Sequence, residues 1–225
     1  MSTPTITHTD EEIQQDVLDE LAWEAELQPN EIGVVVKNGV VTLTGWVDSY
    51  TKRWRAERAA LRVRGVEAVA NDIEVRLPGS SERTDSDIAA AARQALESDA
   101  FAPHEGIKVT VSKGWVTLEG EVNWQYQRRE AERAVRRLTG VRGVTNLIKV
   151  SPRIEPSPAE LKKRIEDALV RSAETDAERI QVKVNGSTVV LEGTVRSWAE
   201  RETAERIAWS GPGVLKVDNK IKIRP

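Results

Sequence analysis

The chain has 225 residues, with 33 Lys or Arg and 36 Asp or Glu, and a net charge of −3 at pH 7. It contains no cysteine, which excludes disulfide bonds and thiolate metal sites. No stretch is apolar enough to span a membrane, and the N-terminus lacks the basic and apolar regions of a signal peptide, so the cytoplasm is the expected location.

A short phrase with the pattern V-x-L-x-G occurs three times at nearly constant spacing, which is typical of tandem modules. The phrases are VTLTGWV, VTLEGEV and VVLEGTV, and their glycines are Gly45, Gly120 and Gly193. The predicted modules are residues 8–77, 84–152 and 157–225. Short, proline-bearing linkers join them, which favours semi-rigid spacing.

Each module is predicted to begin with an amphipathic helix. In the first module, Thr9 and Glu12 have the spacing of a capping box. Apolar residues then recur every four positions, at Ile13, Val17 and Leu21. Equivalent caps are predicted at Thr84 and Ser157.

Two strands joined by a tight turn follow the first helix. Asn38-Gly39 is a strong hairpin signal, and the turn glycine of the third module is shifted by one place, so a different turn is expected there. Gly45 falls on the packed face of the second strand. We expect a helix to cross the sheet at this point and to leave no room for a side chain; a β-bulge is the alternative.

A second helix with small apolar residues and a third strand complete the module. A glycine ends each second helix, at Gly65, Gly140 or Gly213. The third strand is expected to run parallel to the second, beside either of the first two strands. The predicted fold class is therefore α+β: three tandem helix-strand-strand-helix-strand modules, each with a small three-stranded mixed sheet and helices on one face.

This order of elements, the V-x-L-x-G strand and the closing pattern G-V-x-x-V-x-N resemble the BON (bacterial OsmY and nodulation) domain over nearly the whole chain. The resemblance implies a non-enzymatic module associated with phospholipid membranes and with envelope or osmotic stress. Many members are exported, and the N-terminus of this chain departs from that pattern.

The residues do not indicate an enzyme or a metal site. His8 and His104 are not at equivalent positions of the repeat, and without cysteine the common nucleophile-base pairs are absent. Three acidic residues, Asp10, Glu11 and Glu12, lie at the start of the first predicted helix. A favourable interaction with the helix dipole explains them better than a bound cation does. The sequence predicts no catalytic residue, no metal and no cofactor.

Aromatic and basic residues gather between the second strand and the second helix of each module, in predicted loops. Trp and Tyr suit the lipid headgroup layer, and arginines pair with anionic phosphates. The predicted lipid-binding residues are Tyr50, Arg53, Trp54, Arg55, Arg58, Trp124, Tyr126, Arg128, Arg129, Arg133, Trp198 and Arg201. The rings are not at identical repeat positions, so packing at joints between modules is the alternative.

Peripheral binding to anionic phospholipid is the function predicted from these residues. The alternative is a cytoplasmic protein-interaction scaffold or a self-assembling stress protein, including a homo-oligomer. The GVRG at 140–143 matches the G-x-x-G of an RNA-binding KH loop in one module only, and the acidic balance opposes nucleic-acid binding.

Overall fold

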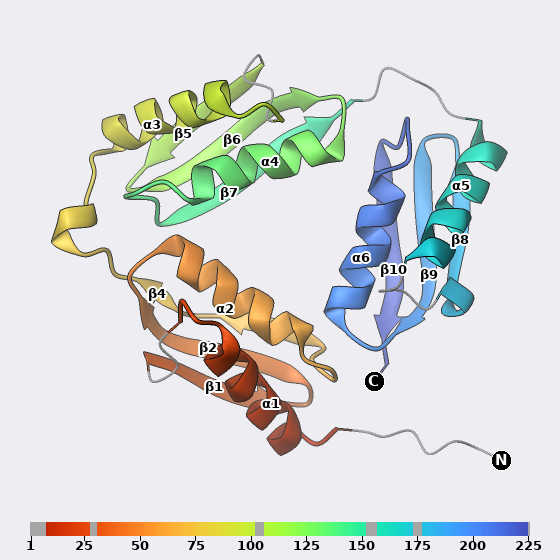
Figure 1. Ribbon diagram of the computed structural model, residues 1–225, viewed down its shortest axis with the longest axis horizontal. Helices are drawn as coiled ribbons and strands as arrows, with labels where there is room; N and C mark the ends of the chain where they lie inside the picture. The colour runs from red at the N-terminus through yellow and green to blue at the C-terminus, as the bar shows by residue number, and fades with distance from the viewer. Residues whose placement is uncertain (1–7, 28–30, 102–105, 152–156, 173–176, 225) are drawn as a thin grey trace. The chain divides into compact units, whose positions relative to one another are not determined.

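The computed structural model describes residues 8–27, 31–101, 106–151, 157–172 and 177–224, which form three α+β modules (Figure 1). Most of the second predicted linker lies outside these residues. The first module consists of α1 (Asp10–Trp23), β1 (Ile32–Lys37), β2 (Val40–Val47), α2 (Tyr50–Arg62), β3 (Ala68–Asn71) and β4 (Glu74–Val75). A short 3-10 helix, η2 (Gly79–Ser81), follows it.

The other two modules repeat this order with an unbroken third strand. The second consists of α3 (Asp85–Ser98), β5 (Ile107–Ser112), β6 (Trp115–Val122), α4 (Gln125–Arg136) and β7 (Gly143–Val150). The third consists of α5 (Pro158–Arg171), η3 (Ala177–Arg179), β8 (Ile180–Asn185), β9 (Thr188–Val195), α6 (Trp198–Trp209) and β10 (Lys216–Ile223). The predicted fold class is confirmed.

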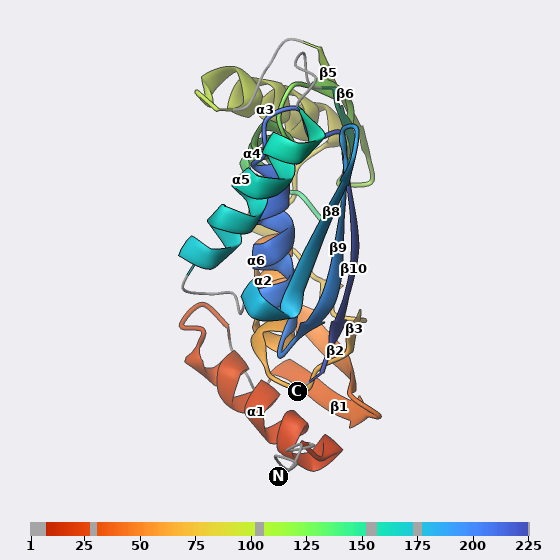
Figure 2. The same cartoon turned by 90° about the vertical axis from the view of Figure 1, so that its right-hand side faces the viewer.

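The second strand of each module is the central strand of its sheet. β6 pairs with β5 in the antiparallel sense and with β7 in the parallel sense, and β9 is flanked by β8 and β10 in the same way. In the first module β3 and β4 both pair with β2, so they act as one interrupted strand. This pairing decides the position of the third strand, which the sequence leaves open. Figure 2 shows the sheet of the third module edge-on, with α5 and α6 on the same face.

Each module encloses a core between its two helices and its sheet. The predicted stripe of the first helix is at most 2% exposed at Ile13, Val17 and Leu21, and its counterparts in α3 and α5 are as deeply buried. Small residues of the second helix, such as Ala56 and Ala60, are fully buried. Because alanine is short, the second helix lies close to the sheet.

Capping boxes start the first two modules. Thr9 Oγ1 accepts a hydrogen bond from the Glu12 amide at 3.2 Å, and the Thr9 amide donates back to Glu12 at 2.8 Å. Thr84 and Asp87 form the same box, and the hydrogen bond from the Thr84 hydroxyl to the carboxylate lowers the pKa of Asp87. The cap predicted at Ser157 is wrong as a side-chain hydrogen bond. Pro158 occupies the first position of α5 instead, and its fixed φ favours a helix start without that bond.

The acid at the first helix start also holds the hairpin turn. Asn38 and Gly39 both have positive φ, as a type I′ turn requires, and their amides donate to the carboxylate of Asp10 at 2.7 and 2.9 Å. Asp85 accepts the equivalent two amides in the second module. The third module has Pro158 in place of the acid, and its turn begins with Gly186 at φ 57°, which fits a type II′ turn. The expected difference in turn geometry is therefore present.

The expected reason for Gly45 is wrong. A Cβ atom on Gly45 would overlap the backbone carbonyl oxygen of Glu31, just before β1, and not a helix. Gly120 and Gly193 meet the carbonyls of Gly106 and Arg179 in the same way, and all three glycines have positive φ. A bulge is not the explanation either, because β6 pairs with β7 without an extra residue on either side of Gly120. The glycine is needed because the chain entering the edge strand passes directly over it.

Candidate functional site

The predicted aromatic and basic residues lie in helices and not in the expected loops. α2 begins at Tyr50 and α6 at Trp198, while Trp124 stands immediately before α4. The remaining predicted residues occupy the first two or three turns of these helices. Their side chains are therefore arranged at helical spacing, and residues three and four positions apart are neighbours on the helix surface.

Polar side chains just before the helices explain the early starts. Ser49 Oγ accepts from the Lys52 amide at 3.4 Å, and Ser197 Oγ accepts from the Glu200 amide at 3.3 Å. In the second module, the Gln127 side chain accepts from the Trp124 amide at 3.1 Å. These contacts satisfy backbone amides that have no partner within the helix.

Three of the predicted arginines belong to a cluster that joins the second helix to the third strand. In the second module, Arg128 Nη2 donates to the carbonyl of Asn146 at 3.2 Å. The Asn146 side-chain amide donates to the carbonyl of Arg128 at 2.9 Å and to Glu132 at 3.2 Å. Its oxygen accepts from the Ile148 amide at 3.2 Å. We call Arg128, Glu132 and Asn146, together with the equivalent residues of the other modules, the Arg-Glu-Asn cluster.

The third module repeats the cluster closely. Arg201 donates to the carbonyls of Ile221 at 3.1 Å and Asn219 at 2.8 Å, and Asn219 donates to Glu205 at 2.9 Å. In the first module the cluster consists of Arg53, Glu57 and Asn71, with Asn71 donating to Glu57 at 2.9 Å. The guanidinium groups of Arg128 and Arg201 are thus committed to backbone carbonyls of their own modules.

The sequence contains a signal for this cluster that is separate from the pattern of aromatic and basic residues. Arginine, glutamate and asparagine recur at the same three repeat positions in all modules. A charged residue at an invariant repeat position indicates a role in the fold, as it does for the aliphatic core. The aromatic rings lack that regularity.

Acidic residues in the last turn of α1 and just after it pair with arginines of the first module. Arg55 lies 3.0 Å from Glu26, and Arg62 lies 2.7 Å from Glu20 and 2.5 Å from Glu24. Glu20, Glu24 and Glu26 are three of the acidic residues that give the first module its negative charge. They also reduce the positive charge that α2 presents to a ligand.

Cation-π contacts hold two of the predicted tryptophans beside arginines. The guanidinium carbon of Arg58 lies 5.7 Å from the Trp54 ring centre, and that of Arg201 lies 4.7 Å from the Trp198 ring centre. Tyr50, Trp54, Trp124 and Trp198 are all partly buried. Their rings therefore offer edges and part of a face to solvent, and not a whole aromatic surface.

The second module presents the clearest basic surface among the predicted residues. Tyr126, Arg129, Arg133 and Arg137 follow one another at helical spacing along α4 and its C-cap, and all four are exposed. We call them the α4 stripe. Within it, Arg133 lies 3.5 Å from Glu130. Arg136, which is outside the stripe, has a side chain that is only 11% exposed, and burial lowers its pKa. The equivalent positions in α6 include Glu202, so the third module has no matching stripe.

No group of three or more His, Cys, Asp or Glu side chains that could hold a metal ion occurs in the described parts of the chain. Of the two histidines of the chain, His8 lies within the described parts and His104 lies outside them. Among the helices described, none is long and apolar enough to cross a membrane.

A search of curated proteins finds osmotically-inducible protein Y of Escherichia coli (strain K12), 32% identical over 127 residues. The match covers 55% of this chain and 63% of the relative, so less than two thirds of the relative's length is spanned. Solved structures of CdsD, a structural protein of the type III secretion system of Chlamydia trachomatis, match 92% and 97% of the chain and 90% and 100% of the CdsD chains. Their identities are 14% and 13% and their TM-scores 0.26 and 0.27, values too low to relate the two arrangements.

The family model of the BON domain matches three segments of the chain, which together cover most of it. The matched residues are 9–76, 84–152 and 157–225. Each segment contains one helix-strand-strand-helix-strand unit of the structure. The chain therefore belongs to the BON domain family and carries three tandem copies of the domain.

Proposed function

We propose that this chain is a non-enzymatic array of binding modules that attaches weakly and peripherally to anionic phospholipid surfaces during osmotic or envelope stress. The observation that carries the proposal is the α4 stripe, where three exposed arginines follow one tyrosine on a single helix face. The link to osmotic stress rests on the name of the E. coli relative, osmotically-inducible protein Y.

The stripe has the dimensions and charge of a weak electrostatic contact. Arg129 and Arg137 are eight residues apart, which is roughly 12 Å along a helix. Each arginine near an anionic surface contributes about 1 kcal/mol, so three contribute about 3 kcal/mol, less than millimolar affinity alone requires. Tyr126 adds an amphipathic ring suited to the headgroup layer. Binding is therefore expected to be weak, to fall with salt and to gain from additional contacts on the same chain.

Vesicle co-sedimentation tests this proposal. We expect the chain to bind vesicles containing phosphatidylglycerol and not vesicles of phosphatidylcholine alone. The double variant Arg129→Gln/Arg133→Gln removes about 2 kcal/mol of attraction and is expected to bind roughly 30-fold more weakly. A matched control, Arg93→Gln/Lys149→Gln, removes two exposed charges of the same module outside α4.

The control is expected to bind nearly as well as the parent chain. Equal losses in the two double variants would mean that net charge, and not the α4 stripe, governs attachment. Failure of the parent chain to bind phosphatidylglycerol vesicles would reject the membrane proposal and favour the second candidate.

The second candidate is a protein-interaction scaffold, and large exposed apolar side chains favour it. Trp23 is 85% exposed, Val170 73% and Phe101 66%. Large apolar side chains exposed to this extent are typical of contact surfaces. Self-association that persists in high salt and is lost in Trp23→Ser, measured by analytical ultracentrifugation, would support this candidate.

A further inference from the structure

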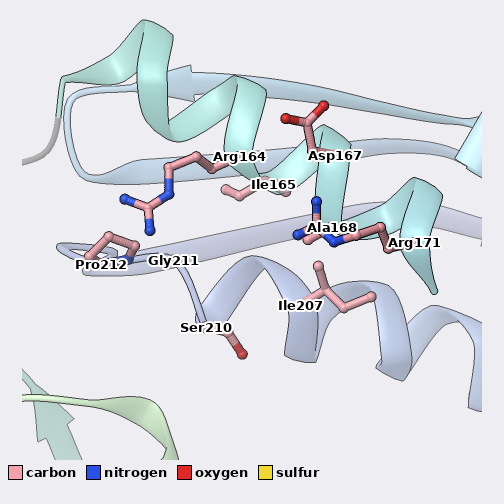
Figure 3. Close-up of a pocket in the computed structure, with 9 residues that line it drawn as sticks. All are labelled: Arg164, Ile165, Asp167, Ala168, Arg171, Ile207, Ser210, Gly211 and Pro212. Carbon is pink, nitrogen blue, oxygen red and sulfur yellow. The ribbon is translucent and has the colours of Figure 1, made fainter.

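The third module has a groove between its two helices that carries an inference beyond membrane attachment. The groove has a volume of about 350 Å³ and lies between α5 and α6 (Figure 3). Its lining includes Arg164, Ala168 and Arg171 from α5 and Ile207, Ser210 and Gly211 from α6 and the residues after it. This volume is at the small end of the range for ligand sites in proteins.

The residues that shape the groove are particular to this module. Gly211 stands where the other modules have Val63 and Leu138, side chains that pack on their own module cores. Glycine contributes no side chain to the groove wall, and a methyl group there would lie 2.7 Å from Cδ1 of Leu161. Leu161 thus occupies the space of that side chain, and the groove is lined at this point by Ser210, Gly211 and Pro212, which follow α6.

Two arginines, seven residues apart on α5, bring positive charge to the groove. Figure 3 shows the Arg164 side chain extending toward Gly211 and Pro212 and the Arg171 side chain running back along α5 toward Ala168, while the carboxylate of Asp167 points away from α6. Arg164 has a 3.9 Å contact with the exposed Glu160, and Arg171 forms no ion pair with any residue in the described segments. The first module has Asp16 and Trp23 at these two positions, and the second has Ala91 and Ser98.

Between the arginines, the apolar surface of the groove comes from Ala168 and Ile207, which are partly exposed. Ile165 is 2% exposed and forms part of the module core, and Ile207 packs against the same core. The side chain of Ile207 reaches from α6 toward α5 in Figure 3, opposite Ala168. An apolar centre with guanidinium groups on its rim matches a ligand that has an apolar body and an acidic group.

We propose that this groove binds a single acyl chain that ends in an anionic group. Its volume suits one chain and not the two chains of a phospholipid. The anionic group is a carboxylate or a phosphate, since guanidinium pairs with both. The site is separate from the α4 stripe, and it makes the third module a ligand-binding module and not a weaker copy of the second.

The test is a titration of the full chain, labelled with ¹⁵N, with sodium decanoate below its micelle concentration. The expected result is saturable shifts of the backbone amides of Ser210 and Gly211, with no comparable shifts in the other modules. Acetate lacks the chain and decanol lacks the charge, so each is expected to bind at least tenfold more weakly. Tighter binding of decyl phosphate than of decanoate would assign the acidic group to phosphate, and the reverse would assign it to carboxylate.

Matched variants separate this site from general charge. Arg164→Gln/Arg171→Gln is expected to weaken decanoate binding at least tenfold, while Lys163→Gln, on the same helix but outside the groove lining, leaves it unchanged. Arg129→Gln/Arg133→Gln, which tests membrane attachment, is also expected to leave it unchanged. The proposal is overturned by the absence of saturable shifts at Ser210 and Gly211, by equal binding of acetate, or by equal affinities of the two arginine double variants.

Discussion

A glycine at one strand position in each module is required by the backbone that crosses over it. At Gly120, φ is +144° and a Cβ atom would overlap the carbonyl oxygen of Gly106. This overlap can be relieved only if the backbone that leads into β5 moves. This movement would disturb the pairing of Ile107 with Gly120, the last pair of the antiparallel ladder.

We therefore expect Gly120→Ala to lower the stability of the second module by about 2 kcal/mol or more, through strain and overlap. Hydrogen exchange of the β5 and β6 amides measures the change within that module. Gly79→Ala is the control, because no atom lies within 4 Å of its added Cβ, and a change within about 0.5 kcal/mol is expected. Similar protection in both variants would show that the overlap is relieved at little cost.

The residue scale also shows where sequence reasoning stops. The repeated motif shows that a glycine is needed at Gly45 and its counterparts, but it does not show why. The atom that excludes a side chain at Gly45 belongs to Glu31, fourteen residues earlier. Asp10 is similar. Its place at a helix start explains its charge, whereas its bonds to the amides of Asn38 and Gly39 depend on how the helix and the hairpin pack.

Adjacent arginines on α4 have different roles at the scale of the element. Arg128 joins α4 to β7 through the Arg-Glu-Asn cluster, while Arg129 is exposed on the α4 stripe. Arg128→Gln is expected to destabilise the second module by about 2 kcal/mol, since it removes hydrogen bonds of a charged group. Arg129→Gln is expected to change stability by less than about 0.5 kcal/mol.

The measurement is hydrogen exchange of the β7 amides, with that of Ile148 as the reporter because it donates to Asn146. Vesicle binding supplies the second readout, and there Arg129→Gln is expected to have the effect. If the β7 amides remain fully protected in Arg128→Gln, the Arg-Glu-Asn cluster does not stabilise the fold.

Elements with periodic patterns could be predicted from the sequence, and their pairing could not. The helices, the hairpins and the closing glycines Gly65, Gly140 and Gly213 follow from spacing and turn residues. The third strand is compatible with either neighbour by pattern alone, and only packing places it beside the second strand. The starts of α2, α4 and α6 were expected too late because aromatic and basic residues obscured the caps at Ser49 and Ser197.

The candidate site was predictable in composition but not in arrangement. The sequence identifies arginines near aromatic rings, but it does not show that Arg55 faces Glu26 or that Arg129 and Arg133 remain exposed. The groove of the third module was not predicted, since it depends on how closely the helices α5 and α6 approach each other.

At the scale of the whole molecule, each module has the parts of an independent folding unit. The second module contains a complete sheet and a core that includes Ile88, Leu118 and Val135. We expect residues 84–151 expressed alone to give a dispersed ¹H–¹⁵N spectrum and cooperative urea unfolding, although domains of this size have modest stability. Resonances confined to the random-coil range would instead show that this module needs its neighbours.

The repetition of the Arg-Glu-Asn cluster has a consequence for how the chain acquires its structure. The cluster is the same in all three modules, so it does not distinguish the third strand of one module from that of another. Exchange of equivalent strands is a characteristic failure of tandem repeats. Correct pairing therefore depends on order in time: during synthesis, β3 follows α2 after only a few residues and meets β2 before β7 or β10 has left the ribosome.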